Sequence, residues 1–168
     1  MSDKAVSKDA IVIERTFDAP IDFIWKLWTQ PEEFKKWYGP RSFSVPVVEM
    51  DVRIGGKRLV CMERQTPNGT MKMWTTGEYT EIVPKTRLVY TESMSDEHGN
   101  VILPSSMGMG DDYPVTTEII VQLKALGNRT KMVMTHAGLP AGGQGAGDGW
   151  GQAFDKLAEY IATAPNVK

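Results

Sequence analysis

The stretch GWGQAFDKLAEYI, residues 149–161, decides the fold because it has the pattern of a long amphipathic helix. Its apolar side chains share one stripe at the helical period: Trp150, Phe154, Leu157, Ala158 and Ile161. We predict a helix over residues 149–163, about four turns and roughly 20 Å long. Such a helix can lie across a sheet and bury its stripe there.

A glycine-rich segment, GGQGAGDG at residues 142–149, comes directly before this stretch. It has no Gly-Lys-Ser/Thr and no G-x-G-x-x-G, and the elements before it are hairpins, so it does not fit a phosphate-binding loop. We interpret it as an adjustable connection, with Asp148 capping the helix. This connection would let Trp150 settle against the sheet and let the helix shift when a ligand enters.

The first part of the chain predicts one strand and two short helices. Residues 11–17, IVIERTF, are short and rich in β-branched side chains, which is typical of a strand. Pro20 suits the first turn of a helix ending near Thr29, and apolar residues follow at i, i+3, i+4 and i+7: Ile21, Ile24, Trp25 and Trp28. A second helix begins at Pro31 and stops at Gly39-Pro40.

The middle of the chain alternates as strands do. Residues 43–52 predict a strand at a sheet edge or with a bulge, because Pro46 cannot donate to a ladder. Asn68-Gly69 and Gly127-Asn128 predict tight hairpin turns. Five further strands are predicted at residues 57–65, 71–83, 87–94, 115–126 and 129–136. The total is about seven strands.

This order of elements predicts an α+β fold. One antiparallel sheet must bury its apolar face against the helices, and strongly twisted sheets curl, so a cavity is expected between sheet and helix. We expect a single domain over residues 1–168 with its core at 11–163. The polar, irregular residues 95–114 predict a lid-like loop, because loops of this length are usually functional or disordered.

Composition narrows the classes of partner. The 168 residues include 19 Lys and Arg and 21 Asp and Glu, and this net charge of -2 gives no broad attraction to nucleic acid or to anionic membranes. The start of the chain lacks the apolar run of a secretory signal, so we expect a cytoplasmic protein. Cys61 is the one cysteine, which rules out an internal disulfide and a cysteine-based zinc site.

Several stretches together resemble the helix-grip, START-like (SRPBCC) superfamily, and within it the group named after the activator of the Hsp90 ATPase. They are RTFDAPIDFIWKLWTQPEEFKKWYGP, DVRIGGKRLVCME, TTGEYTEIVPKTRLVYTE, EHGN, THAGLP and GWGQAFDKLAEYI. Their order and spacing carry the resemblance from about residue 11 to 161. One departure is Trp37-Tyr38-Gly39-Pro40, where members of the group often have paired tryptophans before Gly-Pro.

The resemblance implies a curved antiparallel sheet wrapped around a C-terminal helix, with an apolar cavity between them. It implies little about chemistry, because relatives include lipid carriers, hormone receptors, polyketide cyclases and co-chaperone domains. The function therefore has to be argued from the site.

Alternation places Met132, Met134 and His136 on one strand face, and the ten methionines suit a pocket for varied apolar ligands or a loosely specified core. The face of Arg58, which shares its parity with Val60 and Met62, is left open. We predict a ligand-binding set without catalytic residues: Trp37, Tyr38, Phe43, Met62, Met73, Tyr90, Met109, Met132, Met134, His136, Trp150, Phe154 and Leu157.

Three functions are considered. The first is binding of a small hydrophobic or aromatic molecule, without an established reaction. The second is a co-chaperone-like module that acts on an Hsp90-type ATPase. A protein partner or a homodimer is left open for each of the three. The third is an enzyme of the cyclase or hydrolase kind, with His136, Glu49 or Glu78 as general base. His136 and His98 lack metal-ligand spacing, so neither a metal nor another cofactor is expected.

Overall fold

The computed structural model describes residues 9–107, 114–139 and 144–164 and contains a seven-stranded antiparallel sheet with three α-helices. The elements in chain order are β1 (Asp9–Phe17), α1 (Ile21–Thr29), α2 (Pro31–Phe34), β2 (Ser44–Met50), β3 (Lys57–Thr66), β4 (Gly69–Val83), β5 (Arg87–Ser95), η2 (Pro104–Met107), β6 (Thr117–Leu126), β7 (Arg129–Leu139) and α3 (Gln144–Thr163).

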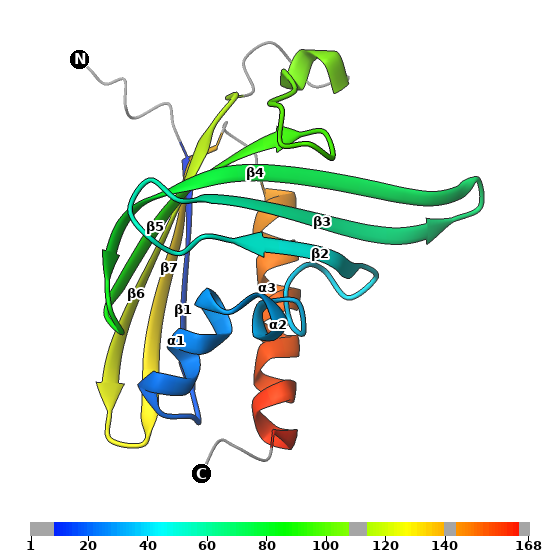
Figure 1. Ribbon diagram of the computed structural model, residues 1–168. Helices are drawn as coiled ribbons and strands as arrows, with labels where there is room; N and C mark the ends of the chain where they lie inside the picture. The colour runs from blue at the N-terminus through cyan, green and yellow to red at the C-terminus, as the bar shows by residue number, and fades with distance from the viewer. Residues whose placement is uncertain (1–8, 108–113, 140–143, 165–168) are drawn as a thin grey trace.

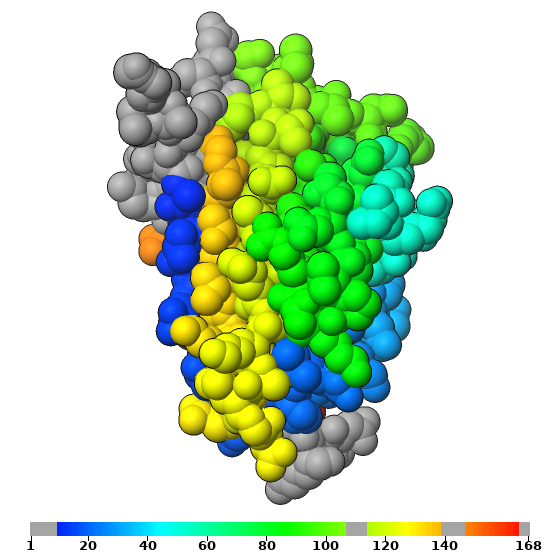
Figure 2. Space-filling model, turned by 90° about the vertical axis from the view of Figure 1, so that its left-hand side faces the viewer, coloured from blue at the N-terminus to red at the C-terminus, as the bar shows by residue number. Residues whose placement is uncertain are grey.

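The strands lie in the order β1-β7-β6-β5-β4-β3-β2, so all neighbours except β1 and β7 are consecutive in the chain. The sheet curves around α3, and α1 and α2 lie on the same concave side (Figure 1). The opposite, convex side shows β1, β7, β6 and β5 next to one another (Figure 2). The predicted α+β helix-grip fold is confirmed.

Local signals account for most of these elements. Pro20 begins the turn of α1, and Pro31 is the first residue of α2. Gly127 has the positive φ of 66° that the β6–β7 hairpin needs, and Gly69 has a φ of 117° at the start of β4. The prediction for Pro46 is confirmed, because β2 is an edge strand and its register with β3 shifts between Ser44 and Val47.

Gly77 permits a close approach between β4 and β5. A Cβ atom at this position would lie 1.9 Å from the carbonyl oxygen of Thr91 and 3.5 Å from Cγ of Arg58. Any side chain would therefore push the strands apart. The regular pairing of the two strands also shifts nearby, between Tyr79 and Glu81.

Helix α3 begins at Gln144, five residues before the predicted start. The predictions of a loop over residues 144–149 and of a cap at Asp148 were therefore wrong, because Asp148 is an exposed residue within the helix. The first turns lie beside distant segments, because Cβ atoms at Gly147 and Gly149 would be at ordinary contact distances, 3.7 Å from Ile11 and 3.4 Å from Pro40. Glycine costs helix stability, so packing of these turns beside β1 and the segment after α2 has to offset that cost. Residues 142 and 143 lie outside the described residues.

The region of the predicted lid is partly described. An isolated bridge joins Ser95 to Val101, and η2 follows. Residues 108–113, and with them Met109, lie outside the described residues. Closure over the site stays a prediction.

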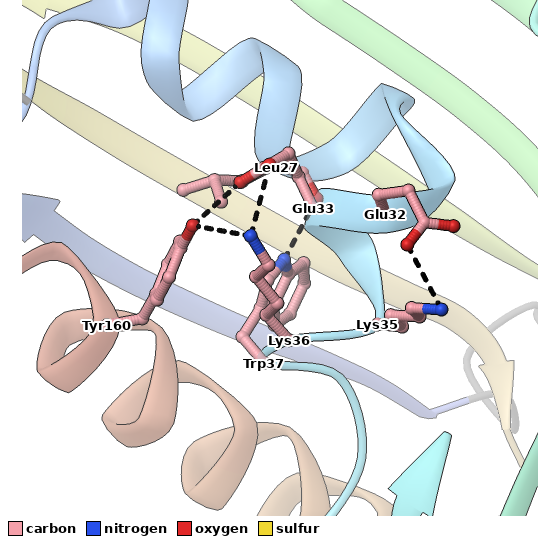
Figure 3. Close-up of polar contacts among 7 residues, drawn as sticks. All are labelled: Leu27, Glu32, Glu33, Lys35, Lys36, Trp37 and Tyr160. Carbon is pink, nitrogen blue, oxygen red and sulfur yellow. Dashed lines mark hydrogen bonds and ion pairs between the residues drawn. The ribbon is translucent and has the colours of Figure 1, made fainter. Parts of the chain in front are cut away.

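Two contacts join the last turns of α3 to the region of α2. The Tyr160 hydroxyl donates to Oε1 of Glu33 at 2.9 Å and accepts from Nζ of Lys36 at 3.0 Å (Figure 3). The Trp37 indole donates to the carbonyl of Leu27 at 2.9 Å. The short helices are thereby positioned between the sheet and α3.

Candidate functional site

Aromatic rings occupy much of the space between α3 and the sheet. The rings of Trp28 and Trp37 have centroids 4.8 Å apart, and those of Trp150 and Phe154 are 5.6 Å apart. The Trp28 and Trp150 rings stack at 6.0 Å and so connect α1 to α3. This part of the interior is a packed core.

A chain of hydrogen bonds runs from α3 into the sheet through His136. The Trp150 indole donates to Nδ1 of His136 at 3.1 Å, and Nε2 of His136 lies 2.8 Å from Oγ1 of Thr117. An indole N–H is a donor only, so Nδ1 carries no proton. Nε2 therefore holds the proton of a neutral imidazole and donates it to Thr117, whose hydroxyl donates in turn to the carbonyl of Glu92 at 3.4 Å.

Burial and a nearby carboxylate act in opposite directions on His136. Burial lowers the pKa of His136, and Glu92, whose Oε1 lies 3.9 Å from Nε2, raises it by a smaller amount. The pKa is therefore below the ordinary value. Both ring nitrogens are also held by protein groups, which favours a structural part for this side chain over acid-base work.

Glu92 is the carboxylate that faces the interior. Its side chain is 15% exposed, and its Oε2 accepts a hydrogen bond from the Tyr38 hydroxyl at 3.3 Å. Tyr38 is buried, and burial followed by the charge of Glu92 raises the pKa of its phenol well above the usual value. The phenol therefore stays protonated and remains a donor.

Arg58 is a buried cation among aromatic rings. Only 2% of the residue is exposed, and the guanidinium carbon lies 3.8 Å from the ring centroid of Tyr90, 5.4 Å from that of Phe34 and 5.9 Å from that of Tyr79. Contacts of this length are favourable cation–π interactions. They place Arg58 on the concave side of β3, which settles the face that the sequence left open.

Partly exposed apolar side chains lie farther along the same concave face. Met62 pairs with Met73 across β3 and β4, and Met94 pairs with Thr75 across β4 and β5. Sδ of Met62 lies 3.0 Å from the place that a Cβ on Gly39 would take, and Phe43 contacts the same glycine position. The β3–β4 hairpin reaches past α3 here (Figure 1). We call these four side chains, Phe43, Met62, Met73 and Met94, the methionine face.

The structure brings most of the predicted ligand-binding residues to the concave side, where the expected shared face of Met132, Met134 and His136 is confirmed. Buried members of the set are Trp37, Tyr38, Tyr90, Met132, Met134, His136, Trp150, Phe154 and Leu157. Partly exposed members are Phe43, Met62 and Met73. Contact of any of them with a ligand stays a prediction.

The two carboxylates suggested as general bases do not face the interior. Glu49 is exposed and has the opposite parity to Val48 and Met50, which contact the core. Glu78 pairs with Lys57 at 2.6 Å on the outer side. Glu92 was not predicted from the sequence. Its parity in β5 is that of Leu88 and Tyr90, and this was a signal that it faces the interior.

A groove of about 650 Å³ lies on the outer side of the sheet, away from α3. Leu59, Thr76 and Thr91 form part of its floor, and His98 and Val101 form part of its wall. This is not the cavity that the sequence predicts between sheet and helix. Within the described ranges, no three His, Cys, Asp or Glu side chains gather as a metal site, and none of the helices combines the length and the hydropathy of a membrane span.

Comparisons with known proteins agree with this geometry. The sequence model of the family described as "Activator of Hsp90 ATPase homolog 1-like protein" matches residues 18–162. The search of curated proteins found no match.

Solved structures of other bacterial proteins are similar in fold, as three examples show. A protein from Nitrosomonas europaea has a TM-score of 0.71 at 23% identity, covering 91% of this chain and 94% of its own. A solution structure of a protein from Arthrobacter aurescens has a TM-score of 0.72 at 22% identity, covering 99% and 93%. An AHSA1 protein from Silicibacter pomeroyi has a TM-score of 0.71 at 17% identity, covering 92% and 98%. At these identities the likeness shows the fold alone.

Proposed function

The chain belongs to the activator of Hsp90 ATPase homolog 1-like family, and from this premise we propose that it binds a small apolar molecule on the concave side of its sheet. The observation that carries the proposal is the methionine face. Its four side chains are partly exposed, and Met62 among them packs against the buried core.

The side-chain types of the methionine face support this function. Methionine is unbranched and polarizable, so neighbouring methionines adapt to ligands of different shape. Met62 and Met73 directly oppose each other, and Phe43 adds a ring at the same edge. Covering these groups with an apolar ligand would remove hydrocarbon from water, which is favourable by about 25 cal/mol per Å².

Polar groups near the methionine face support a defined orientation of the ligand. The Tyr38 hydroxyl and the Glu92 carboxylate lie on the same concave side, and Glu92 is two residues before Met94 on β5. Small-molecule sites are mostly apolar with a few convergent polar groups, and this arrangement has that composition.

Native mass spectrometry of the freshly purified protein, followed by titration with 1-decanol under methyl NMR, tests the proposal. With ¹³C-methyl methionine, we expect the signals of Met62, Met73 and Met94 to shift together as decanol is added. Met62→Gln should weaken binding by roughly tenfold, because it places an amide where a thioether would contact the ligand.

Leu126→Gln is the matched control, because Leu126 is 43% exposed at the β6–β7 hairpin. It should leave the affinity unchanged. Absence of any co-purified adduct together with unmoved methionine signals would contradict the proposal. Stimulation of an Hsp90-type ATPase by the same sample would then favour the interaction module.

A further inference from the structure

Arg58 carries a charge that no carboxylate neutralises directly among the described residues. Its Nε atom is buried without a hydrogen-bond partner there. Glu92, the carboxylate on the same face, accepts from Tyr38 at 3.3 Å and lies 3.9 Å from His136. A buried guanidinium without a direct ionic partner is costly, and ring faces offset only part of the cost.

Two hydroxyl groups beside Arg58 are also without partners. The Tyr79 and Tyr90 hydroxyls are buried and make no hydrogen bond within the described parts of the chain. The two rings contact each other at 5.8 Å, and the guanidinium lies over the ring of Tyr90. Burial raises the pKa of Tyr90, so its hydroxyl keeps its proton and can donate. Buried polar groups in native proteins nearly always have hydrogen-bond partners. Three neighbouring groups without one therefore indicate that a partner from outside the chain binds there.

We propose that Arg58, Tyr79 and Tyr90 bind the carboxylate head group of an otherwise apolar ligand. Nε of Arg58 and the two phenols supply hydrogen-bond donors, and the guanidinium supplies the charge. This inference rests on the proposed function, and it specifies the ligand as an apolar monoacid.

The placement of these groups suits such a molecule. Arg58 and Met62 are four residues apart on one face of β3, which is roughly 13 Å along the strand. A carboxylate at Arg58 would therefore leave an apolar body directed toward the methionine face. The nearby Glu92 disfavours a dianion, so a monoanionic carboxylate fits better than a phosphate.

Calorimetric titrations with decanoate and 1-decanol test the inference on the unmutated protein and on Arg58→Met. Decanoate should bind the unmutated protein more tightly than decanol does. Arg58→Met should weaken decanoate binding by roughly ten- to hundredfold, the usual effect of losing a charge-assisted hydrogen bond, and so remove the preference for decanoate over decanol. A parallel titration with 1-naphthoate distinguishes an aromatic acid from an aliphatic one.

Arg64→Met is the matched control, because Arg64 is an exposed arginine on the same strand whose guanidinium contacts the ring of Phe43 at 5.5 Å. It should leave the preference for decanoate intact. If decanoate and decanol bound with equal affinity, both to the unmutated protein and to Arg58→Met, the inference would be overturned. The proposed function would still stand. Binding of none of the three probes would remove both.

A second readout does not depend on the variant folding. In the unmutated protein, the ¹H–¹⁵Nε signal of Arg58 should shift on addition of decanoate and not on addition of decanol. An Arg58 signal that responds equally to both compounds would overturn the inference.

Discussion

The indole of Trp150 and the imidazole of His136 form a buried hydrogen bond of 3.1 Å between α3 and β7. The bond joins the first half of α3 to β7, which lies between β1 and β6 in the sheet. Because it requires an unprotonated Nδ1, protonation of His136 breaks it. The attachment of α3 to the sheet therefore depends on pH.

We expect the free energy of unfolding to decrease as pH falls below about 6.5, the usual pKa of histidine. The pKa of His136 is lowered in the folded state by burial, so the unfolded chain binds a proton first. The contribution is fully present above the unfolded pKa and is lost as pH falls through the lower folded pKa. Urea unfolding between pH 5 and pH 8 measures this slope.

The same series on two variants identifies the group responsible. His136→Gln should flatten the slope in this range, whereas His98→Gln should not, because the His98 side chain is 75% exposed. NMR of the imidazole nitrogens at pH 8 should show the proton of His136 on Nε2. A proton on Nδ1 would contradict the hydrogen-bond direction assigned here.

Arg58→Met should leave the ligand-free protein as stable as before or stabilise it by up to about 2 kcal/mol. Replacing a buried charge by an apolar side chain of similar volume removes its desolvation cost. Arg58→Ala should instead destabilise by about 2 kcal/mol, because it leaves a cavity between three rings. Chemical unfolding measures both, and a large loss in Arg58→Met would mean that the charge itself stabilises the fold.

Gly77→Ala should destabilise the protein by about 3 kcal/mol. The added Cβ would lie 1.9 Å from the carbonyl oxygen of Thr91, and backbone must move to relieve such a contact. Thermal and urea unfolding measure the loss. Wild-type stability in this variant would show that β4 and β5 do not approach so closely.

Gly151→Ala should have the opposite effect and stabilise by about 1 kcal/mol. Gly151 lies inside α3, and no atom outside its own surroundings lies within 4 Å of the added Cβ. Alanine favours the helix over glycine by about this amount in exposed positions. An unchanged or lowered midpoint in the same unfolding experiments would contradict the placement of Gly151 within the helix.

Much of the fold follows from local sequence patterns. Turn residues and alternation predicted the strands near their observed bounds, and alternation placed Met132, Met134 and His136 on the inner face. The start of α3 was missed because glycine disfavours a helix locally. The first turns of this helix lie beside Ile11 and Pro40, residues more than 100 positions earlier in the chain, and such tertiary packing can outweigh local preference.

The polar part of the site was harder to predict. In β3, Arg58 shares one face with Val60 and Met62. Because that face carries both a charge and apolar side chains, alternation alone does not show whether it points to the core or to solvent. The choice depends on the rings of Phe34, Tyr79 and Tyr90, which belong to three other segments. Side-chain packing between distant segments is not visible in a local pattern.

The pairing of β1 with β7 has a consequence for how the chain folds during synthesis. Phe17 pairs with Thr130, so more than 100 residues separate the first strand from its partner along the chain. At roughly 5 to 20 residues per second, a ribosome needs about 5 to 20 s to make that interval. Throughout this time β1 has no β7 to pair with, and its backbone hydrogen-bonding groups are open to pairing with a wrong strand. The barrier to productive folding is therefore expected to fall only after β7 has left the exit tunnel.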